Sequence, residues 1–232
     1  MAFVAHRDRE RRVPPARRRG LLLGLAMLCV ASLAPASADS PDLAGDVIAV
    51  RMWAYGTPPD QARRDLFLKD DVYVRERLET VTDGALHVHL MDDTVLRLGS
   101  ATSVVLDQFV YAPDADATTL LANLSKGVCR FLTGRTTKKN VKVVTPAATI
   151  AARGTVFSVW VKDDGSTTVW VQEGEVDVTP RDGSAPAIVG AGEIVLAPVT
   201  GGGIRLDAPR PAADPGIQET PRIYFFRRKS IR

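Results

Sequence analysis

Residues 141–179 read VKVVTPAATIAARGTVFSVWVKDDGSTTVWVQEGEVDVT and contain the densest strand pattern of the chain. The stretch contains four short runs rich in Val, Ile, Thr and Trp, which are typical of β-strands: 141–144, 155–161, 167–171 and 175–179. The runs are separated by residues with turn chemistry: Pro146, Gly154, Asp164-Gly165 and Gly174. The stretch therefore predicts consecutive strands with almost no spacers.

Alternation within 155–161 assigns the two faces of that strand. The more uniformly apolar set is predicted to face the core: Thr155, Phe157, Val159 and Val161. Trp160 then lies on the outer face or on a face shared with another part of the fold. Asp164-Gly165 is a pair that tight hairpin turns with positive φ favour, so we expect the flanking strands to pair antiparallel.

Comparable runs extend over most of the chain, at spacings of about eight to twelve residues. Ser125-Lys126-Gly127 is predicted to join two of them, 118–124 and 128–132, and the best helical candidate, 60–67, is short. The sequence therefore predicts an all-β fold of coiled antiparallel strands with no substantial helix after the signal peptide. A solenoid-like coil, a sandwich and a barrel all fit this pattern.

Basic residues are concentrated at the start of the chain. The formal net charge is +3, but the first 19 residues hold seven Arg against Asp8 and Glu10. The rest of the chain holds 23 Lys and Arg against 25 Asp and Glu. A nucleic-acid partner bound through a basic surface is therefore excluded.

Residues 1–38 have the organisation of a secretory signal peptide. An arginine-rich start precedes the uncharged run 21–33, which is too short to span a bilayer, and small residues follow up to Ala38. We expect cleavage near Ala38 and a periplasmic or secreted protein, by either the general or the twin-arginine route. Cys29 would leave with the signal, so Cys129 would be the one remaining cysteine, predicted as a small core residue.

The predicted domain spans 45–198, and 199–232 is predicted to be a Gly- and Pro-rich tail. Within the tail, 223–226 is an apolar patch of four residues, Ile-Tyr-Phe-Phe. It fits a last docked strand, a mobile end or a partner-binding peptide.

The sequence contains few candidates for catalytic or ligand-binding residues. His87 and His89 share one face of a strand and could begin a metal site with Asp92 or Asp93, but Leu86, Val88 and Leu90 claim the core face, so we expect both rings to face solvent. The sequence contains no G-x-S-x-G nucleophile motif or phosphate-binding loop, and we predict no catalytic, cofactor or metal site. Four aromatic residues suggest either a sugar-stacking surface or ordinary packing: Trp53, Tyr55, Trp160 and Trp170.

The central stretch resembles the FecR family of bacterial periplasmic domains. The resemblance rests on 144–157, on 169–178 and on Gly190-Ala191-Gly192-Glu193, and it extends over roughly 45–198. The motif residues, which we expect to be structural, are Thr145, Pro146, Arg153, Gly154, Thr155, Phe157, Gly174 and Gly192.

Each motif position suggests a local role. Thr145-Pro146 is expected to be an entry turn. Gly154 is expected to be a strand break or bulge where a side chain would not fit, so that Gly154→Val would destabilise the fold. Arg153 is expected to pair with Glu173 or Glu175.

The resemblance implies an exported, non-catalytic, strand-coiled domain used for contact or sensing. The best-known members are membrane-spanning regulators of sigma factors, whereas this chain has a cleavable signal and about thirty residues after the domain. We therefore expect a binding, sensing or signalling module whose partner is another envelope protein, without direct sigma-factor control. The alternative is a cell-envelope polysaccharide-binding or structural protein.

Overall fold

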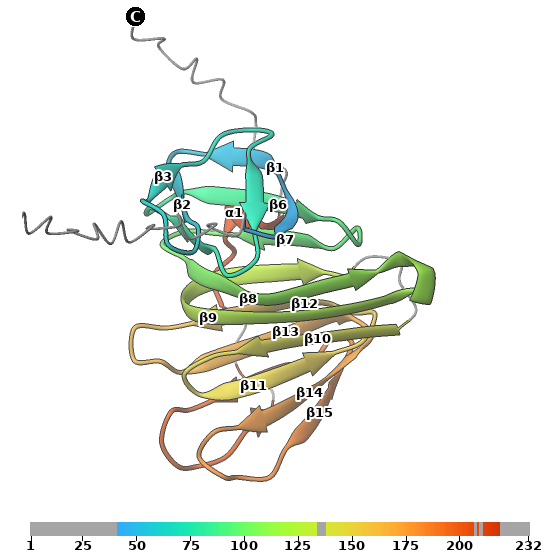
Figure 1. Cartoon of the computed structure of the whole chain (residues 1–232). Helices are drawn as coiled ribbons and strands as arrows, with labels where there is room; N and C mark the ends of the chain where they lie inside the picture. Colours follow the sequence, from blue (N-terminus) through green and yellow to red (C-terminus); the bar gives the residue numbers. More distant parts are fainter. Residues whose placement is uncertain (1–40, 134–137, 207, 209–210, 219–232) are drawn as a thin grey trace, which may run out of the picture. The chain divides into compact units, whose positions relative to one another are not determined.

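The computed structural model describes residues 41–133, 138–206, 208 and 211–218, which belong to one compact unit, Asp39–Arg232. They form seventeen β-strands, a 3-10 turn at Pro113–Ala115 and a single helical turn, α1 (Pro215–Gln218) (Figure 1). The predicted all-β fold without a substantial helix is confirmed. In the described part of the chain, no helix has the length and hydropathy needed to cross a membrane.

The strands form one continuous hydrogen-bonded sheet that is folded into two facing layers. Layer A contains, in spatial order, β4 (Asp71–Tyr73), β1 (Leu43–Arg51), β6 (Ala85–Leu90), β7 (Val95–Leu98), the second half of β9 (Ala117–Leu132), β12 (Val156–Val161), β13 (Thr167–Glu173), β16 (Ile194–Ala197) and β17 (Arg205–Leu206).

Layer B is built in the same way. Its spatial order is β3 (Arg64–Asp65), β2 (Ala54–Thr57), β5 (Arg77–Thr80), β8 (Ser103–Ala112), the first half of β9, β10 (Lys138–Val144), β11 (Ala148–Ala152), β14 (Glu175–Pro180) and β15 (Ala187–Gly190). Figure 1 shows β9, β10, β11, β14 and β15 running side by side. Among the described strands, the pairing is antiparallel except between β9 and β10.

Along the chain, pairs of strands alternate between the layers after β9. The strands β10 and β11 lie in layer B, β12 and β13 in layer A, β14 and β15 in layer B, and β16 and β17 in layer A. The chain therefore coils around a shared core, so the solenoid-like and sandwich descriptions both apply to one structure.

The strand β9 belongs to both layers because it bends at Gly127. Its first half pairs with β8 and β10, and its second half pairs with β7 and β12. The backbone of Gly127 has φ +84°, which L side chains rarely adopt. The predicted turn at 125–127 is therefore a corner within one sixteen-residue strand.

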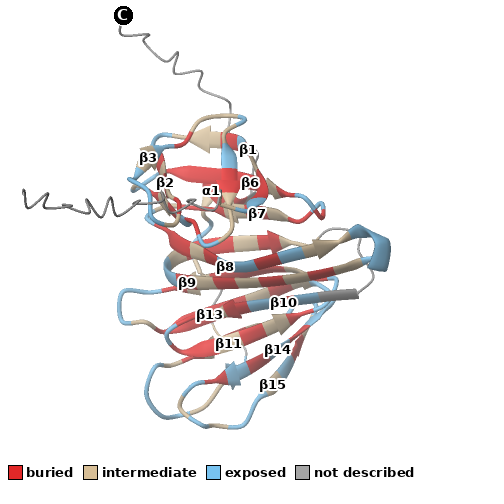
Figure 2. Cartoon of the chain, in the orientation of Figure 1, coloured by how far each residue is buried: buried red, intermediate tan, exposed pale blue. Residues whose placement is uncertain are grey.

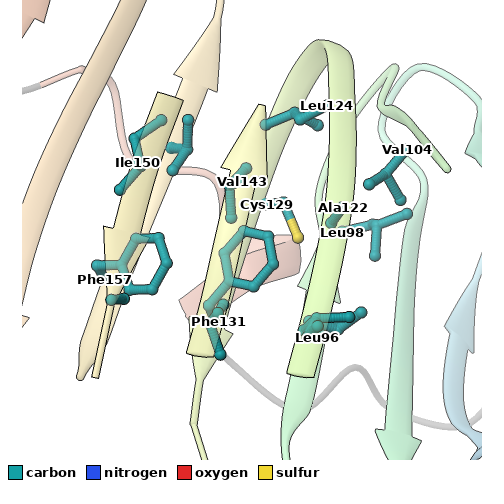
Figure 3. Close-up of a cluster of buried hydrophobic side chains, with 14 of the residues drawn as sticks. Leu96, Leu98, Val104, Ala122, Leu124, Cys129, Phe131, Val143, Ile150 and Phe157 are labelled. Atoms are coloured by element: carbon teal, nitrogen blue, oxygen red, sulfur yellow. The ribbon is translucent and has the colours of Figure 1, made fainter. Parts of the chain in front are cut away.

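The core lies between the layers and follows from the period-two pattern of the strands. In β14, buried Val176 and Val178 alternate with exposed Glu175, Asp177 and Thr179. Figure 2 shows the same alternation as red and paler bands along neighbouring strands. Figure 3 shows buried side chains of both layers, with Val143 and Ile150 from layer B and Phe131 and Phe157 from layer A. The rings of Phe131 and Phe157, on the paired strands β9 and β12, stack with centroids 5.0 Å apart.

The faces predicted for 155–161 are confirmed, since Phe157, Val159 and Val161 are buried in the core and Trp160 is half-buried on the outer face. The hairpin at Asp164-Gly165 is also confirmed: β12 and β13 pair antiparallel, and Gly165 has φ +80°. The helical candidate 60–67 is wrong, because it contains the short strand β3 instead.

Part of the predicted tail 199–232 is ordered against the strands. Arg205–Leu206 form β17, and α1 contacts β6, β7 and β9. Ile217 in α1 is 1% exposed, so it is as buried as a core residue. The apolar patch 223–226 lies outside the described residues.

Candidate functional site

The motif glycines lie where the chain crosses from one layer to the other. Gly154 separates β11 from β12, Gly174 separates β13 from β14, and Gly192 separates β15 from β16. Their φ angles are +66°, +79° and +89°, a conformation that costs other residues free energy. The expectation that a side chain would not fit at Gly154 is wrong, because a Cβ there would meet nothing within 4 Å. Glycine is favoured at this position by its conformation.

Thr145 makes the turn between β10 and β11 through its side chain. Its hydroxyl donates to the carbonyl of Ala148 (3.0 Å) and accepts hydrogen bonds from the Ala148 amide (3.0 Å) and the Thr167 hydroxyl (2.8 Å). A hydroxyl has one donor and two acceptor positions, so this group is fully used. Since Thr167 is in β13, the same contact also joins the turn in layer B to layer A.

Replacing Thr145 with valine will lower the free energy of unfolding by about 2–3 kcal/mol, because a buried amide and a buried hydroxyl lose their partner. Thr149→Val in β11 is the matched control, since Thr149 is half-buried in the neighbouring strand, and it will change stability by less than about 0.5 kcal/mol. Urea denaturation followed by tryptophan fluorescence measures both. Equal stabilities for the two variants would contradict the role given to the hydroxyl.

The remaining motif residues stabilise the crossing between β11 and β12. Thr155 is buried, and its hydroxyl donates to the carbonyl of Glu175 at the start of β14 (3.3 Å). Phe157 is the core residue that stacks on Phe131. Arg153 is exposed, and the described residues show no salt bridge between it and Glu173 or Glu175.

His87 and His89 do not share one environment. His87 is 1% exposed, contrary to the expectation that it faces solvent, because α1 covers the outer face of β6. Its Nε2–H donates to the carbonyl of Gly216 (2.6 Å), and burial lowers its pKa from 6.5 to about 4. The ring is therefore neutral at pH 7. The covering residue is distant in sequence, so alternation in β6 alone could not show it.

His89 is partly exposed, as expected, with Asp93 3.2 Å from its Nε2 and Asp46 3.8 Å from its Nδ1. Asp92 instead accepts hydrogen bonds from the amide and hydroxyl of Thr94. Among the described residues, no group of three or more His, Cys, Asp or Glu side chains is placed to hold a metal ion.

The four aromatic residues of the sugar-stacking hypothesis are spread over both layers. Tyr55 is in β2 of layer B, where the guanidinium of Arg63 lies 3.6 Å from its ring centroid. Trp160 and Trp170 are on β12 and β13 of layer A, and Trp53 lies between β1 and β2. These side chains therefore do not form one stacking surface.

Trp160 lines a cavity of about 720 Å³ on the outer side of layer A. Arg51, Lys162 and Asp83 also line it, together with residues 211–214 of the C-terminal segment. The cavity thus presents one aromatic ring and charged groups of both signs.

A buried ion pair near β2 had no signal in the sequence. Glu76 is 0% exposed, and its carboxylate accepts hydrogen bonds from Arg64 (2.9 Å) and from the Tyr73 amide (2.8 Å). Burial raises the pKa of Glu76, and the charge and hydrogen bond of Arg64 act against this rise. The pair sits close under Gly56, where a Cβ would overlap the carboxylate.

Cys129 is a buried free cysteine in β9, in agreement with its predicted core role. Burial raises the pKa of its thiol, so the reactive thiolate is disfavoured.

The two layers end at β15 and β17, each of which pairs on one side with a single described strand. Ile188 in β15 is 68% exposed, and Leu206 in β17 is 63% exposed. Leu206 lies opposite the buried core residue Val195, so it stands on the core-facing side of β17. Among the described residues, the outer edges of β15 and β17 have no strand partner. We call this place, defined by β15 and β17, the open end of the coil, and it also carries exposed aliphatic side chains.

Comparison with known proteins supports the family resemblance. Residues 76–177 match the model of the family described as FecR protein. The match includes all the motif residues except Gly192. A search of curated proteins found no match.

Two crystal structures of a "putative anti-sigma factor" from Parabacteroides distasonis ATCC 8503 are similar in part. Each is 22% identical over 56% of this chain and 58% of the other, with TM-scores of 0.48 and 0.47. This chain therefore spans less than two thirds of the length of those proteins.

Proposed function

We propose that this chain is an exported, non-catalytic sensing or signalling module that works by binding another envelope protein. The proposal rests on the match of residues 76–177 to the FecR family model. The family match supports a signalling or sensing role. The arginine-rich start, the uncharged run 21–33 and the small residues before Asp39 support export.

The open end is the surface that fits such a partner best, and the single observation that carries this proposal is the exposure of Ile188 and Leu206 there. A strand edge offers unpaired backbone groups to an extended segment of another protein, and side-chain pockets add specificity. One further strand, supplied by the partner and paired with β17, would cover Leu206 on the core-facing side. The same strand would cover the end of the core. The partner would thus continue the coil.

Export is tested by cell fractionation of the full chain carrying a C-terminal tag. We expect the mature protein in the envelope fraction, with Asp39 or a close neighbour as its first residue. Leu25→Arg places a charge in the apolar run and will retain the full-length chain in the cytoplasm, whereas Leu25→Ile will leave export unchanged. A full-length, unprocessed wild-type chain in the cytoplasm would contradict the proposal.

A second function, binding of an envelope polysaccharide, is favoured by Trp160 in the cavity beside Arg51 and Lys162. Aromatic faces stack on sugar rings, and the two cations suit acidic sugars. Titration with peptidoglycan fragments would then change tryptophan emission in the wild type and leave the emission of Trp160→Leu unchanged. No change in the wild type would remove this candidate.

A further inference from the structure

The segment from Asp214 to Ile217 lies against layer A in the manner of a bound peptide. It reaches this place after the three consecutive glycines 201–203 and the exposed residues 212–213. Its contacts with the strands are local and specific, and they involve β6, β7 and β9.

The surface of layer A contacts three different features of the segment. The Oδ2 of Asp214 accepts a hydrogen bond from the Ser100 amide (2.8 Å), and its Oδ1 accepts one from the Gly216 amide (2.7 Å). The Gly216 carbonyl accepts the hydrogen bond from His87, and Ile217 buries its side chain. An acidic residue, a glycine and an aliphatic residue thus each have a separate contact.

Gly216 lies where there is no room for a larger side chain. A Cβ on Gly216 would lie 2.8 Å from the Cβ of Ala85 and 3.2 Å from the Cα of Gly99. On the strand side, a Cβ on Gly99 would lie 2.5 Å from the Asp214 carboxylate. Both surfaces therefore need glycine at the point where they meet.

We propose that the outer face of β6, β7 and β9 is a peptide-binding site for an Asp-X-Gly-aliphatic turn, filled in this protein by its own residues 214–217. The ligand is a segment of this chain bound in cis, and docking is an equilibrium separate from the folding of the strands. The site is independent of the open end and of the partner proposed there.

The docked state excludes a charge on His87. Docking removes water from the ring, which lowers its pKa, and the Gly216 carbonyl acts in the opposite direction. Arg97 of β7 and Arg51 of β1 lower the pKa further through repulsion of a proton. The docked ring has a pKa of about 4, below the ordinary value of 6.5, and burial under the segment is the largest cause, so acid favours the undocked state. Docking is therefore strongest near neutral pH and weakens as the pH falls toward 4.

The first experiment follows docking in the full chain by NMR, through the amide shifts of Ser100 and Gly216. In Gly216→Val we expect the segment to be released at pH 7.5, with shifts elsewhere in the strands unchanged. Ala212→Ser, at an exposed position of the same segment, will remain docked. In Gly216→Val the Ser100 amide is the reporter, and an unchanged Ser100 shift would overturn the proposal.

The second experiment supplies the ligand in trans. A fluorescein-labelled peptide of residues 211–218 will bind full-length Gly216→Val, whose site is empty, at least tenfold more tightly than the wild type, whose site is occupied. The same peptide with valine in place of its glycine will not bind. Equal binding of both peptides, or no binding to the emptied site, would overturn the proposal.

The pH dependence supplies an independent readout. Between pH 7.5 and 4.5 the docking constant of the wild-type segment will fall. His87→Gln keeps a side-chain amide donor but does not titrate, so its docking will not change with pH over this range. Parallel pH profiles for the two proteins would exclude His87 as the titrating group and overturn its assigned part in the site.

Discussion

Replacing Gly127 with alanine will lower the free energy of unfolding by about 3–5 kcal/mol, by combining the cost of a positive φ with that of an overpacked site. The added Cβ would lie 2.5 Å from the Cα and 2.5 Å from the hydroxyl of Thr102. That hydroxyl accepts a hydrogen bond from the Val128 amide and donates one to the Val128 carbonyl. The substitution therefore disturbs the bend through which β9 joins the two layers.

The variant Gly154→Ala measures the cost of a positive φ angle without the cost of steric crowding. Gly154 also has a positive φ, but a Cβ there would meet nothing within 4 Å, so this variant will lose only about 1–2 kcal/mol. Urea denaturation with tryptophan fluorescence compares the two. If both alanine variants were equally stable, crowding at the Gly127 corner would not be the cause.

Replacing Arg64 with methionine will lower the free energy of unfolding at pH 7 by about 3–5 kcal/mol, since it leaves a buried carboxylate without its counter-charge. Glu76 is fully buried, and Arg64 contributes both a hydrogen bond and an opposite charge to it. The double variant Arg64→Met, Glu76→Gln will recover much of the loss, because a neutral amide still accepts the hydrogen bond from Tyr73.

The sign of the pH effect follows from the raised pKa of Glu76. A carboxyl group whose pKa is higher in the folded than in the unfolded state lowers stability as pH rises above its ordinary value of 4.5. Without Arg64 the pKa rises further, so the deficit of the variant relative to the wild type will grow as the pH rises through the raised folded-state pKa of wild-type Glu76, and it will be absent at and below pH 4.5.

Arg63→Met is the matched control, since its salt bridge with Glu79 (3.5 Å) is exposed, and it will cost less than about 1 kcal/mol. A pH-independent loss in Arg64→Met would show that packing, and not the charge of Glu76, is responsible.

Local patterns predicted much of the fold. The runs of Val, Ile and Thr indicated strands, alternation in 155–161 identified the core face, and Asp164-Gly165 indicated a hairpin. These features depend on neighbours in the chain, so a single sequence carries them. The two layers could not be predicted, because Ser125-Lys126-Gly127 is compatible with either a turn or a corner within one strand.

The features that local sequence patterns did not predict depend mainly on contacts between residues that are far apart in the chain. His87 is buried by Gly216, which lies 129 positions away in the chain, so its exposure could not be inferred from β6. Glu76 is a charged residue in a stretch rich in polar residues, and only the fold brings Arg64 and the Tyr73 amide to its carboxylate. Gly154 was identified as special, but the reason is its φ angle and not a lack of space.

The open end of the coil is the proposed binding surface for an envelope protein. Site-specific photo-crosslinking in cells tests it most directly, with the reactive residue placed at Ile188 or Leu206 and, as a control, at Val110, which is 52% exposed on β8. We predict one and the same crosslinked protein from positions 188 and 206 and none from position 110. Identical crosslinks at all three positions, or none at 188 and 206, would contradict the account.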